Sequence, residues 1–292
     1  MTGSHATWGE RKKYPLTLRG ERLVLGERTW VMGVLNVTPD SFSDGGRFDA
    51  PGGAVAHGLA LFEAGADIVD VGGESTRPNA AAVDAAEERR RVVPVIEALR
   101  RAGRGRLSID TSKSEVAQAA LDAGADLVND VSGFSFDPEM ARVVARAGVP
   151  AVLMHLRGGF GQVHREPRYE DVMGEVAAEL EQAIRRGEEA GVARDRVIVD
   201  PGTGFSKAAE HSLETLRRLP ELARLDRPVL VGPSRKSFMA KIVNRPPDAR
   251  LMGTAGAVAA CVMAGAHLVR VHDVSEMMDV VRVCDAIRGS AC

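Results

Sequence analysis

The sequence predicts an α/β fold in which eight parallel strands close into a (β/α)8 TIM barrel. The main observation is a phrase that repeats along the chain, as EAGADIVDVGG at 63–73, DAGADLVNDVSG at 122–133 and MAGAHLVRVHDV at 263–274. Weaker forms occur at 146–155 and 189–202. Each copy reads as a helix that ends at glycine, a residue suited to the left-handed position after a helix. A short apolar run without alternation follows, which is typical of a strand buried on both faces.

Counting along the chain gives eight such strands, each followed by a helical pattern. The strands are expected at 30–37, 67–72, 106–110, 127–130, 151–155, 196–200, 228–232 and 268–272. The helices are expected at 51–64, 84–101, 114–123, 137–147, 169–190, 208–225, 253–264 and 275–288. Eight β–α units are the number that closes a barrel. A doubly wound open sheet is the alternative, but it usually carries a glycine fingerprint after its first strand, where this chain reads NVTPDSF.

The segment before the first barrel strand predicts a short N-terminal β-hairpin. Residues 16–27, LTLRGERLVLGE, alternate around Arg-Gly in the manner of two paired strands. We expect this hairpin to cap the floor of the barrel. No linker rich in proline and glycine divides the chain, so residues 1–292 are expected to form one domain, with the motif-bearing core at about 30–289 and a flexible segment at 1–15.

Composition excludes several functional classes. The 38 Lys and Arg residues nearly balance the 40 Asp and Glu residues, which argues against a nucleic acid partner. No run of 18 apolar residues occurs, so we expect no membrane span, and the N-terminus lacks an apolar signal core. The three cysteines, Cys261, Cys284 and Cys292, have no CxxC spacing. They fit a reducing compartment, so we expect a cytoplasmic protein.

The candidate functional residues lie where the predicted strands end. They are Asn36, Glu74, Asp110, Asn129, His155, Asp200, Lys236, Arg270 and His272. In a barrel these ends converge on one mouth, where the active sites of this fold lie. A single polar residue at a strand end is often only a helix cap, but capping does not explain polar residues on most of the strands.

The acidic and amide residues at the mouth suit a flat heterocycle. Asp110, Asn129 and Asp200 offer acceptors and one amide, and Lys236 adds a donor and a charge. A carboxylate accepts two parallel N–H groups from a guanidine-like edge. The alternative is a structural ion pair between Asp200 and Lys236. His155 fits either a satisfied residue at a strand end or a ligand contact.

Arginine and histidine near the last strand indicate an anion. Arg270 and His272 are two residues apart, so they are expected to point to the same side. An inward arginine is costly unless it meets an anion, and phosphate is the usual candidate. Thr76 and Arg77 in GESTRP add to this site, although Arg77 alone also fits a solvated loop arginine. Loops 38–47 and 74–80 are expected to close over substrate.

Taken together, the motifs resemble the dihydropteroate synthase family. They are MGVLNVTPDSFSDGG, DVGGESTRP, SIDTSK, NDVSG, LMH, DPGTGF, SRKSF and RVHDV, in this order across about 30–289. The resemblance implies a (β/α)8 barrel that forms a homodimer and works in folate biosynthesis. It also implies condensation of p-aminobenzoate with 6-hydroxymethyl-7,8-dihydropterin diphosphate, with release of pyrophosphate, by Mg²⁺-assisted dissociative displacement.

The resemblance also implies residue roles, with Mg²⁺ as the cofactor and Asn36 as its ligand. The pterin would be held by Asp110, Asn129, Asp200 and Lys236, the diphosphate by Thr76, Arg270 and His272, and p-aminobenzoate by Phe42, Pro78, Phe205, Lys236 and Ser237. Asp110, Lys236, Arg270 and His272 would be the catalytic residues. The chain departs from the family pattern at 156–172, at Thr203, where an aromatic residue is common, and at 208–212, where an asparagine often occurs.

Two other functions share part of this pattern. A metal-dependent barrel hydrolase would also place histidine and aspartate at strand ends, but it would need an HxH pair on the first strand, which reads VMGVLNVT. A pterin- or folate-binding module of the methyltransferase type would share the Asp/Asn pocket. Such a module would not need Arg270 with His272, or the STRP loop.

An apolar stripe on the last two helices is a candidate dimer surface, and core packing explains it equally well. It consists of Ala257, Ala260, Cys261, Met277, Val280 and Val281.

Overall fold

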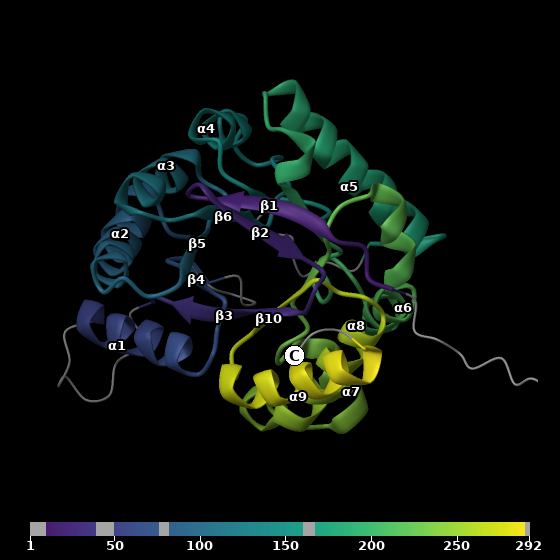
Figure 1. Ribbon diagram of the computed structural model, residues 1–292. Helices are drawn as coiled ribbons and strands as arrows, with labels where there is room; N and C mark the ends of the chain where they lie inside the picture. Colours follow the sequence, from purple (N-terminus) through teal and green to yellow (C-terminus); the bar gives the residue numbers. More distant parts are fainter. Residues whose placement is uncertain (1–9, 39–49, 76–81, 160–166, 290–292) are drawn as a thin grey trace, which may run out of the picture.

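The barrel is present in a computed structural model of the chain, which describes residues 10–38, 50–75, 82–159 and 167–289. Eight parallel strands form one sheet in the order β8-β7-β6-β5-β4-β3-β10-β9. They are β3 Trp30–Asn36, β4 Ile68–Gly72, β5 Arg106–Asp110, β6 Leu127–Asp130, β7 Ala151–Met154, β8 Val197–Asp200, β9 Leu230–Val231 and β10 Leu268–Val271. A parallel bridge between Val199 and Val229 joins the two ends of the sheet. The predicted barrel is therefore confirmed (Figure 1).

The strand register places the polar ends of neighbouring strands at one level. Asn36 pairs with Gly72, and Gly72 pairs with Asp110 on the next strand. Asp110 in turn pairs with Asn129. Because the side chains at one level of a barrel converge, this register gathers residues from separate parts of the sequence at one mouth.

Helices surround the sheet, as Figure 1 shows. They are α1 Ala50–Glu63, α2 Ala85–Arg101, α3 Ser114–Ala123, α4 Met140–Ala147, α5 Val172–Glu189, α6 Ala209–Arg217, α7 Ala240–Val243, α8 Leu251–Met263 and α9 Val274–Arg288. The prediction of one helix over 208–225 was wrong. Here α6 ends at Arg217 and a 3-10 helix follows at Leu219–Leu225, because Pro220 lacks the N–H group that would continue the α-helix.

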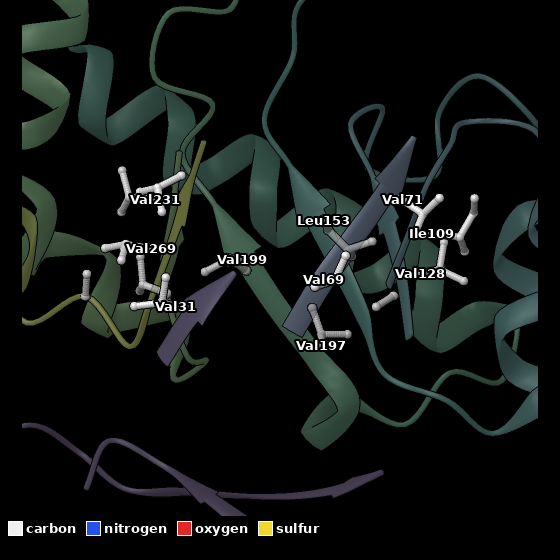
Figure 2. Close-up of a cluster of buried hydrophobic side chains, with 14 of the residues drawn as sticks. Val31, Val69, Val71, Ile109, Val128, Leu153, Val197, Val199, Val231 and Val269 are labelled. Carbon is white, nitrogen blue, oxygen red and sulfur yellow. The ribbon is translucent and has the colours of Figure 1, made fainter. Parts of the chain in front are cut away.

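Alternating strand residues build two separate cores. Val31, Val69 and Val197 point outward and belong to the large cluster between the strands and the helices (Figure 2). Their neighbours Ile68 and Ile198 point inward and belong to a second cluster inside the barrel. The unbroken apolar runs in the sequence follow from this arrangement, since both faces of each strand are buried.

The predicted hairpin is confirmed, and it closes one end of the barrel. Strands β1 Tyr14–Leu18 and β2 Glu21–Leu25 pair around Arg19 and Gly20, both with positive φ, as a tight hairpin turn requires. The alternating residues of β1 are buried against the inner cluster of the barrel. Figure 1 shows the hairpin lying across this end. The polar strand ends lie at the opposite end.

The apolar stripe on the last helices, for which a dimer surface and core packing were both open, is half buried: Ala257 and Val280 are partly exposed and Ala260 is exposed. Cys261, Met277 and Val281 are 0–2% exposed and pack in the large cluster. The exposed large apolar side chains of these helices are instead Met252 on α8 and Val283 and Ile287 on α9. Both interpretations were open because these two helices bury one face against the strands, and the sequence does not show which apolar face is turned inward.

Within the described residues, none of the helices combines the length and the apolar character needed to cross a membrane.

Candidate active site at the barrel mouth

A small cavity of about 30 Å³ lies among the ends of the barrel strands. It is lined by Asp110, Asn129, Val131, Met154, Asp200, Gly202, Thr203, Phe205, Gly232, Lys236 and Arg270. Six of these residues were predicted from the sequence as site residues. A larger cavity of about 630 Å³ lies beside the hairpin at the other end of the barrel, away from the buried acids and bases of the mouth. The mouth cavity is the better candidate, because perturbed acids and bases cluster there.

Arg270 crosses the cavity and contacts two carboxylates. Its Nε donates to Asp70 Oδ2 at 2.7 Å, and its Nη2 donates to Asp110 Oδ2 at 2.6 Å. These two contacts supply the opposite charge that an inward arginine needs. The argument that Arg270 must meet a phosphate to be tolerated was therefore wrong in its premise, because the barrel itself provides the anions.

Asp70 is a central residue that the sequence reasoning missed. It lies in the middle of β4 and is fully buried. The Oδ2 atom that accepts from Arg270 also accepts from Asn129 Nδ2 at 2.9 Å, while Oδ1 has no partner among the described residues. The available signal was an aspartate inside an otherwise apolar run, IVDVG, since an unpaired buried carboxylate is costly.

Burial shifts the protonation of the two predicted pterin acids. Burial raises the pKa of Asp200 to about 6. The Gly202 N–H group, which donates to Oδ1 at 2.7 Å, partly offsets this rise. Burial likewise raises the pKa of Asp110 to about 7, and the positive charge of Arg270 opposes this rise. Both groups thus titrate far above ordinary aspartates, so small changes in their surroundings alter their charge.

Lys236 lies on an aromatic ring rather than in an ion pair. Burial and the Arg270 charge lower the pKa of its ammonium to about 7. Its Nζ is 3.5 Å from the centre of the Phe205 ring, a cation–π contact. In the described part of the chain no ion pair joins Lys236 to Asp200, so the structural alternative for these two residues was wrong.

His272 lies just after β10, beside the cavity. Its Nδ1 is 2.9 Å from Ser234 Oγ. Burial, followed by the charge of Arg270, lowers its pKa to about 3. With the Ser234 hydroxyl donating to Nδ1, the neutral ring carries its proton on Nε2, where it can serve as a donor to a ligand.

Comparison with known proteins decides the family. The model of the family "Pterin binding enzyme" matches residues 32–272, which hold all eight barrel strands apart from the first two residues of β3. The dihydropteroate synthase of Synechocystis is 46% identical over 263 residues, which cover 90% of this chain and 91% of that one. The dihydropteroate synthase of Escherichia coli K12 is 43% identical over 88% of this chain and 90% of its own. The chain belongs to the dihydropteroate synthase family. It is therefore a transferase.

Solved structures of dihydropteroate synthases have the same fold. The Xanthomonas albilineans dihydropteroate synthase with 4-aminobenzoic acid matches with a TM-score of 0.89 at 43% identity, over 96% of this chain and all of that one. The same enzyme in complex with 7,8-dihydropteroate matches with a TM-score of 0.86 at 42% identity, over 95% and 100%.

The remaining residues predicted from the dihydropteroate synthase resemblance have varied places. Asn36 ends β3 at the mouth and is partly exposed. Ser237 begins the 3-10 helix Ser237–Met239 and is exposed outside the cavity lining. Phe42, Thr76, Arg77 and Pro78 lie outside the described residues, together with most of loops 38–47 and 74–80.

Two of the strand-end residues have structural partners. Glu74 Oε1 accepts from the Val83 N–H group at 2.8 Å, and its Oε2 accepts from Lys113 Nζ at 2.6 Å. His155 is buried between Glu179 and Lys207, with Nε2 3.0 Å from Glu179 Oε2. Neither residue lines the mouth cavity, so His155 is a satisfied residue at a strand end.

Proposed function

We propose that this chain condenses p-aminobenzoate with 6-hydroxymethyl-7,8-dihydropterin diphosphate, giving 7,8-dihydropteroate and pyrophosphate. The observation that carries the proposal is the grouping of Asp110, Asn129 and Asp200 around one cavity. Ionised Asp200 suits the parallel N–H donors of the amino-pyrimidine edge of a pterin. The Asn129 amide and Asp110 add further acceptors and donors from two neighbouring strands.

The leaving group is best received by Arg270 and His272. Arg270 already bridges Asp70 and Asp110 at the mouth. A diphosphate would offer it charge-assisted contacts, and the His272 Nε2–H group adds a neutral donor. We infer that Thr76 contributes to the same anion site, as the family pattern implies, and that Arg77 adds to it from the same GESTRP segment.

The reaction needs no covalent intermediate on a side chain. The bond from the pterin methylene carbon to the diphosphate oxygen breaks, and its electron pair leaves with pyrophosphate. The lone pair of the arylamine nitrogen then forms the new bond to the methylene, and the nitrogen loses one proton. Asp110 stabilises the positive charge that develops on the methylene, and Arg270 and His272 stabilise the departing negative charge. The site otherwise positions the reactants and excludes water.

The residues at the mouth fit a Mg²⁺ ion held mostly by the diphosphate. Asn36 offers an amide oxygen at the end of β3, a hard ligand of the kind that Mg²⁺ prefers. The remaining ligands of the ion would come from the diphosphate and water, as is usual for Mg²⁺ at phosphate sites. When bound, Mg²⁺ would neutralise charge on the leaving pyrophosphate.

The arylamine site is proposed beside the pterin. The Phe205 ring and the stem of Lys236 already form one wall of the cavity. Ser237 follows directly at the rim. Phe42 and Pro78 are proposed to complete the site from the two loops, as the family pattern implies.

We further propose that the chain is a homodimer in the cytoplasm. The exposed apolar side chains of α8 and α9, Met252, Val283 and Ile287, offer a surface for a second copy. The described cysteines, Cys261 and Cys284, are free and buried, which fits a reducing compartment.

One assay tests the reaction. Purified protein with the pterin diphosphate, Mg²⁺ and p-aminobenzoate is expected to release pyrophosphate and form dihydropteroate in equal amounts. A non-catalytic pterin module would release no pyrophosphate. A metal-dependent hydrolase would release it without p-aminobenzoate and would contain tightly bound zinc on metal analysis, so either result would overturn the proposal.

A further inference from the structure

A buried lysine lies directly behind the proposed arylamine site. Lys207 is 6% exposed, and burial lowers the pKa of its ammonium to about 7. It does not line the mouth cavity. An apolar side chain would fill the same space without this desolvation cost, so the contacts of the ammonium group are the feature to explain.

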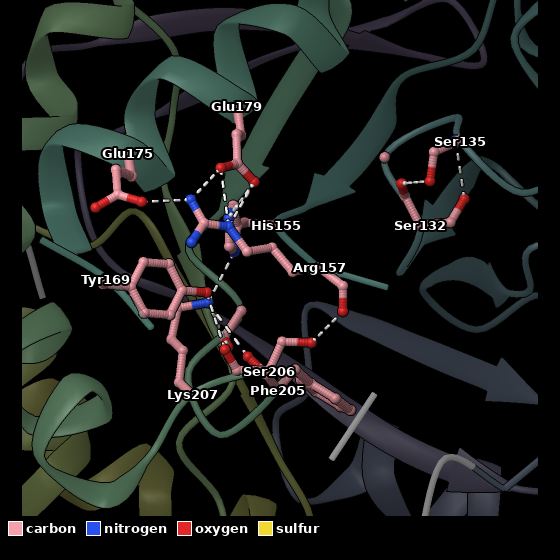
Figure 3. Close-up of polar contacts among 12 residues, drawn as sticks. Ser132, Ser135, His155, Arg157, Tyr169, Glu175, Glu179, Phe205, Ser206 and Lys207 are labelled. Carbon is pink, nitrogen blue, oxygen red and sulfur yellow. Dashed lines mark hydrogen bonds and ion pairs between the residues drawn. The ribbon is translucent and has the colours of Figure 1, made fainter. Parts of the chain in front are cut away.

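Its three N–H donors meet three acceptors from two elements. Lys207 Nζ is 2.8 Å from His155 Nδ1, and it donates to the carbonyl oxygens of Gly202 and Phe205, each at 3.3 Å (Figure 3). His155 Nδ1 accepts here, so its Nε2–H group donates to Glu179. Every hydrogen of the ammonium is thereby used, and two of the three contacts hold the backbone of the loop that follows β8.

This loop has a conformation that it would not keep unaided. Gly202, Gly204 and Ser206 all have positive φ within five residues. A side chain at Gly202 would come within 2.1 Å of the His155 carbonyl oxygen. Because positive φ is unfavourable for a non-glycine residue such as Ser206, tertiary contacts must hold the loop in place.

A second set of contacts holds the end of the loop. Ser206 Oγ donates to the Arg157 carbonyl oxygen at 2.6 Å, and the Tyr169 hydroxyl donates to the Ser206 carbonyl oxygen at 2.9 Å. The Arg157 guanidinium lies 4.1 Å from the centre of the Tyr169 ring and pairs with Glu179. Figure 3 shows these side chains gathered on one side of the loop.

The loop carries Phe205, whose ring lies against Lys236 in the cavity. We propose that Lys207 is a positioning residue for the arylamine site, holding loop 202–206 so that Phe205 stays against Lys236. This inference rests on the proposed function and on the place of Phe205 in that site.

Of the proposed pterin contacts, Asp110 and Asn129 are on strands β5 and β6, away from this loop. Asp200, in contrast, ends β8, and the Lys207 charge opposes the rise that burial causes in its pKa. Loss of Lys207 is therefore expected to affect p-aminobenzoate more than the pterin, rather than p-aminobenzoate alone.

Steady-state kinetics of Lys207→Met test the inference. Methionine keeps the apolar stem and removes all three donors. We expect the KM for p-aminobenzoate to rise about tenfold, while the KM for the pterin diphosphate changes less than about threefold. Tyr169→Phe keeps the ring and removes one loop contact, so its KM for p-aminobenzoate should rise about threefold.

Two control variants separate positioning from loss of folded protein. Lys13→Met makes the same exchange at an exposed residue beside the hairpin and should leave all constants unchanged. Ile198→Val loosens the inner barrel cluster; it should lower the melting temperature and leave both KM values unchanged. An unchanged KM for p-aminobenzoate in Lys207→Met, or an equal rise in both KM values, would overturn the inference. Wild-type protein that forms no dihydropteroate would instead overturn the proposed function first.

Discussion

At the level of single residues, the mouth depends on carboxylates that are buried before any substrate arrives. Asp70 Oδ2 accepts from both Arg270 and Asn129, so one oxygen connects β4 with β10 and β6. Asp110 holds the other side of the same guanidinium. A pterin that hydrogen-bonds to Asp110 must therefore displace Arg270 from this carboxylate. Arg270 would keep its contact with Asp70, and its freed N–H groups could then bind the diphosphate.

The first prediction concerns Asp200, whose raised pKa couples pterin affinity to pH. Its ionised form binds the pterin edge, and its pKa of about 6 lies above the ordinary value. In the free protein this group favours folding at low pH, and that contribution is lost as the pH rises through 6. Pterin affinity has the opposite dependence and should fall about tenfold between pH 7 and pH 5.

Calorimetry with a pterin product and Asp200→Asn provides the check. The variant should bind at least about tenfold more weakly at pH 7, because an amide cannot replace a charge-assisted bidentate contact. The part of the pH dependence centred near 6 should also disappear. Equal affinities for the two proteins would remove Asp200 from the pterin site.

The sequence placed the residues at strand ends but not their partners. Asp110, Asn129, Asp200 and Lys236 were predictable because a parallel barrel turns every strand end toward one mouth. Asp70 was missed although an aspartate inside an apolar run signals a buried carboxylate, and Lys207 lies in a loop where no pattern indicates burial. Their burial depends on which segments from distant parts of the sequence pack against them, and periodicity carries no such information.

At the level of elements, the strands were predicted more accurately than the helices that cover the last part of the barrel. Strand β5 has the predicted bounds, because its polar tip marks its end. The segment at 240–243 forms a short helix, α7, that the sequence did not predict. Four residues are too few to show a helical period.

The hairpin provides the prediction at this scale. Leu16 of β1 is 4% exposed and packs in the inner cluster of the barrel. Leu16→Ala should lower the free energy of unfolding by about 2–5 kcal/mol through the lost burial and the cavity that is left. Urea unfolding measures this, with the exposed neighbour Thr17→Ala as a near-neutral control. Kinetic constants below the unfolding transition should not change, because the hairpin lies at the far end from the mouth; altered constants would contradict this separation.

At the level of the whole molecule, two substrates, a metal ion and the loops have to meet at one mouth. The proposed metal depends on the diphosphate for most of its ligands. EDTA should therefore abolish turnover and Mg²⁺ should restore it, whereas binding of a pterin without the diphosphate should be unaffected. Asn36→Ala should raise the Mg²⁺ concentration for half-maximal activity about tenfold. Full turnover in EDTA would exclude the ion from the mechanism.

Order of binding is the last prediction. Glu74 holds the start of the second loop through Lys113 and the Val83 N–H group, and an anion at Arg270 would add a further attachment. We expect p-aminobenzoate to bind measurably only when pyrophosphate with Mg²⁺, or a pterin product, is already present, as a shift toward the closed loops. Titration calorimetry of p-aminobenzoate into the free protein tests this. Equal binding with and without these ligands would contradict an ordered sequence.

The floor formed by β1 and β2 determines from which end of the barrel ligands enter and leave. Tyr14, Leu16 and Leu18 fill the far end by packing among inward strand residues. Within the described residues the mouth is therefore the end of the barrel through which molecules can reach the cavity. The pterin diphosphate, which binds first, would occupy the deepest part of the cavity. The p-aminobenzoate that binds after it would lie between the pterin and the solvent. We therefore expect dihydropteroate to leave as one molecule with its p-aminobenzoate end toward the solvent.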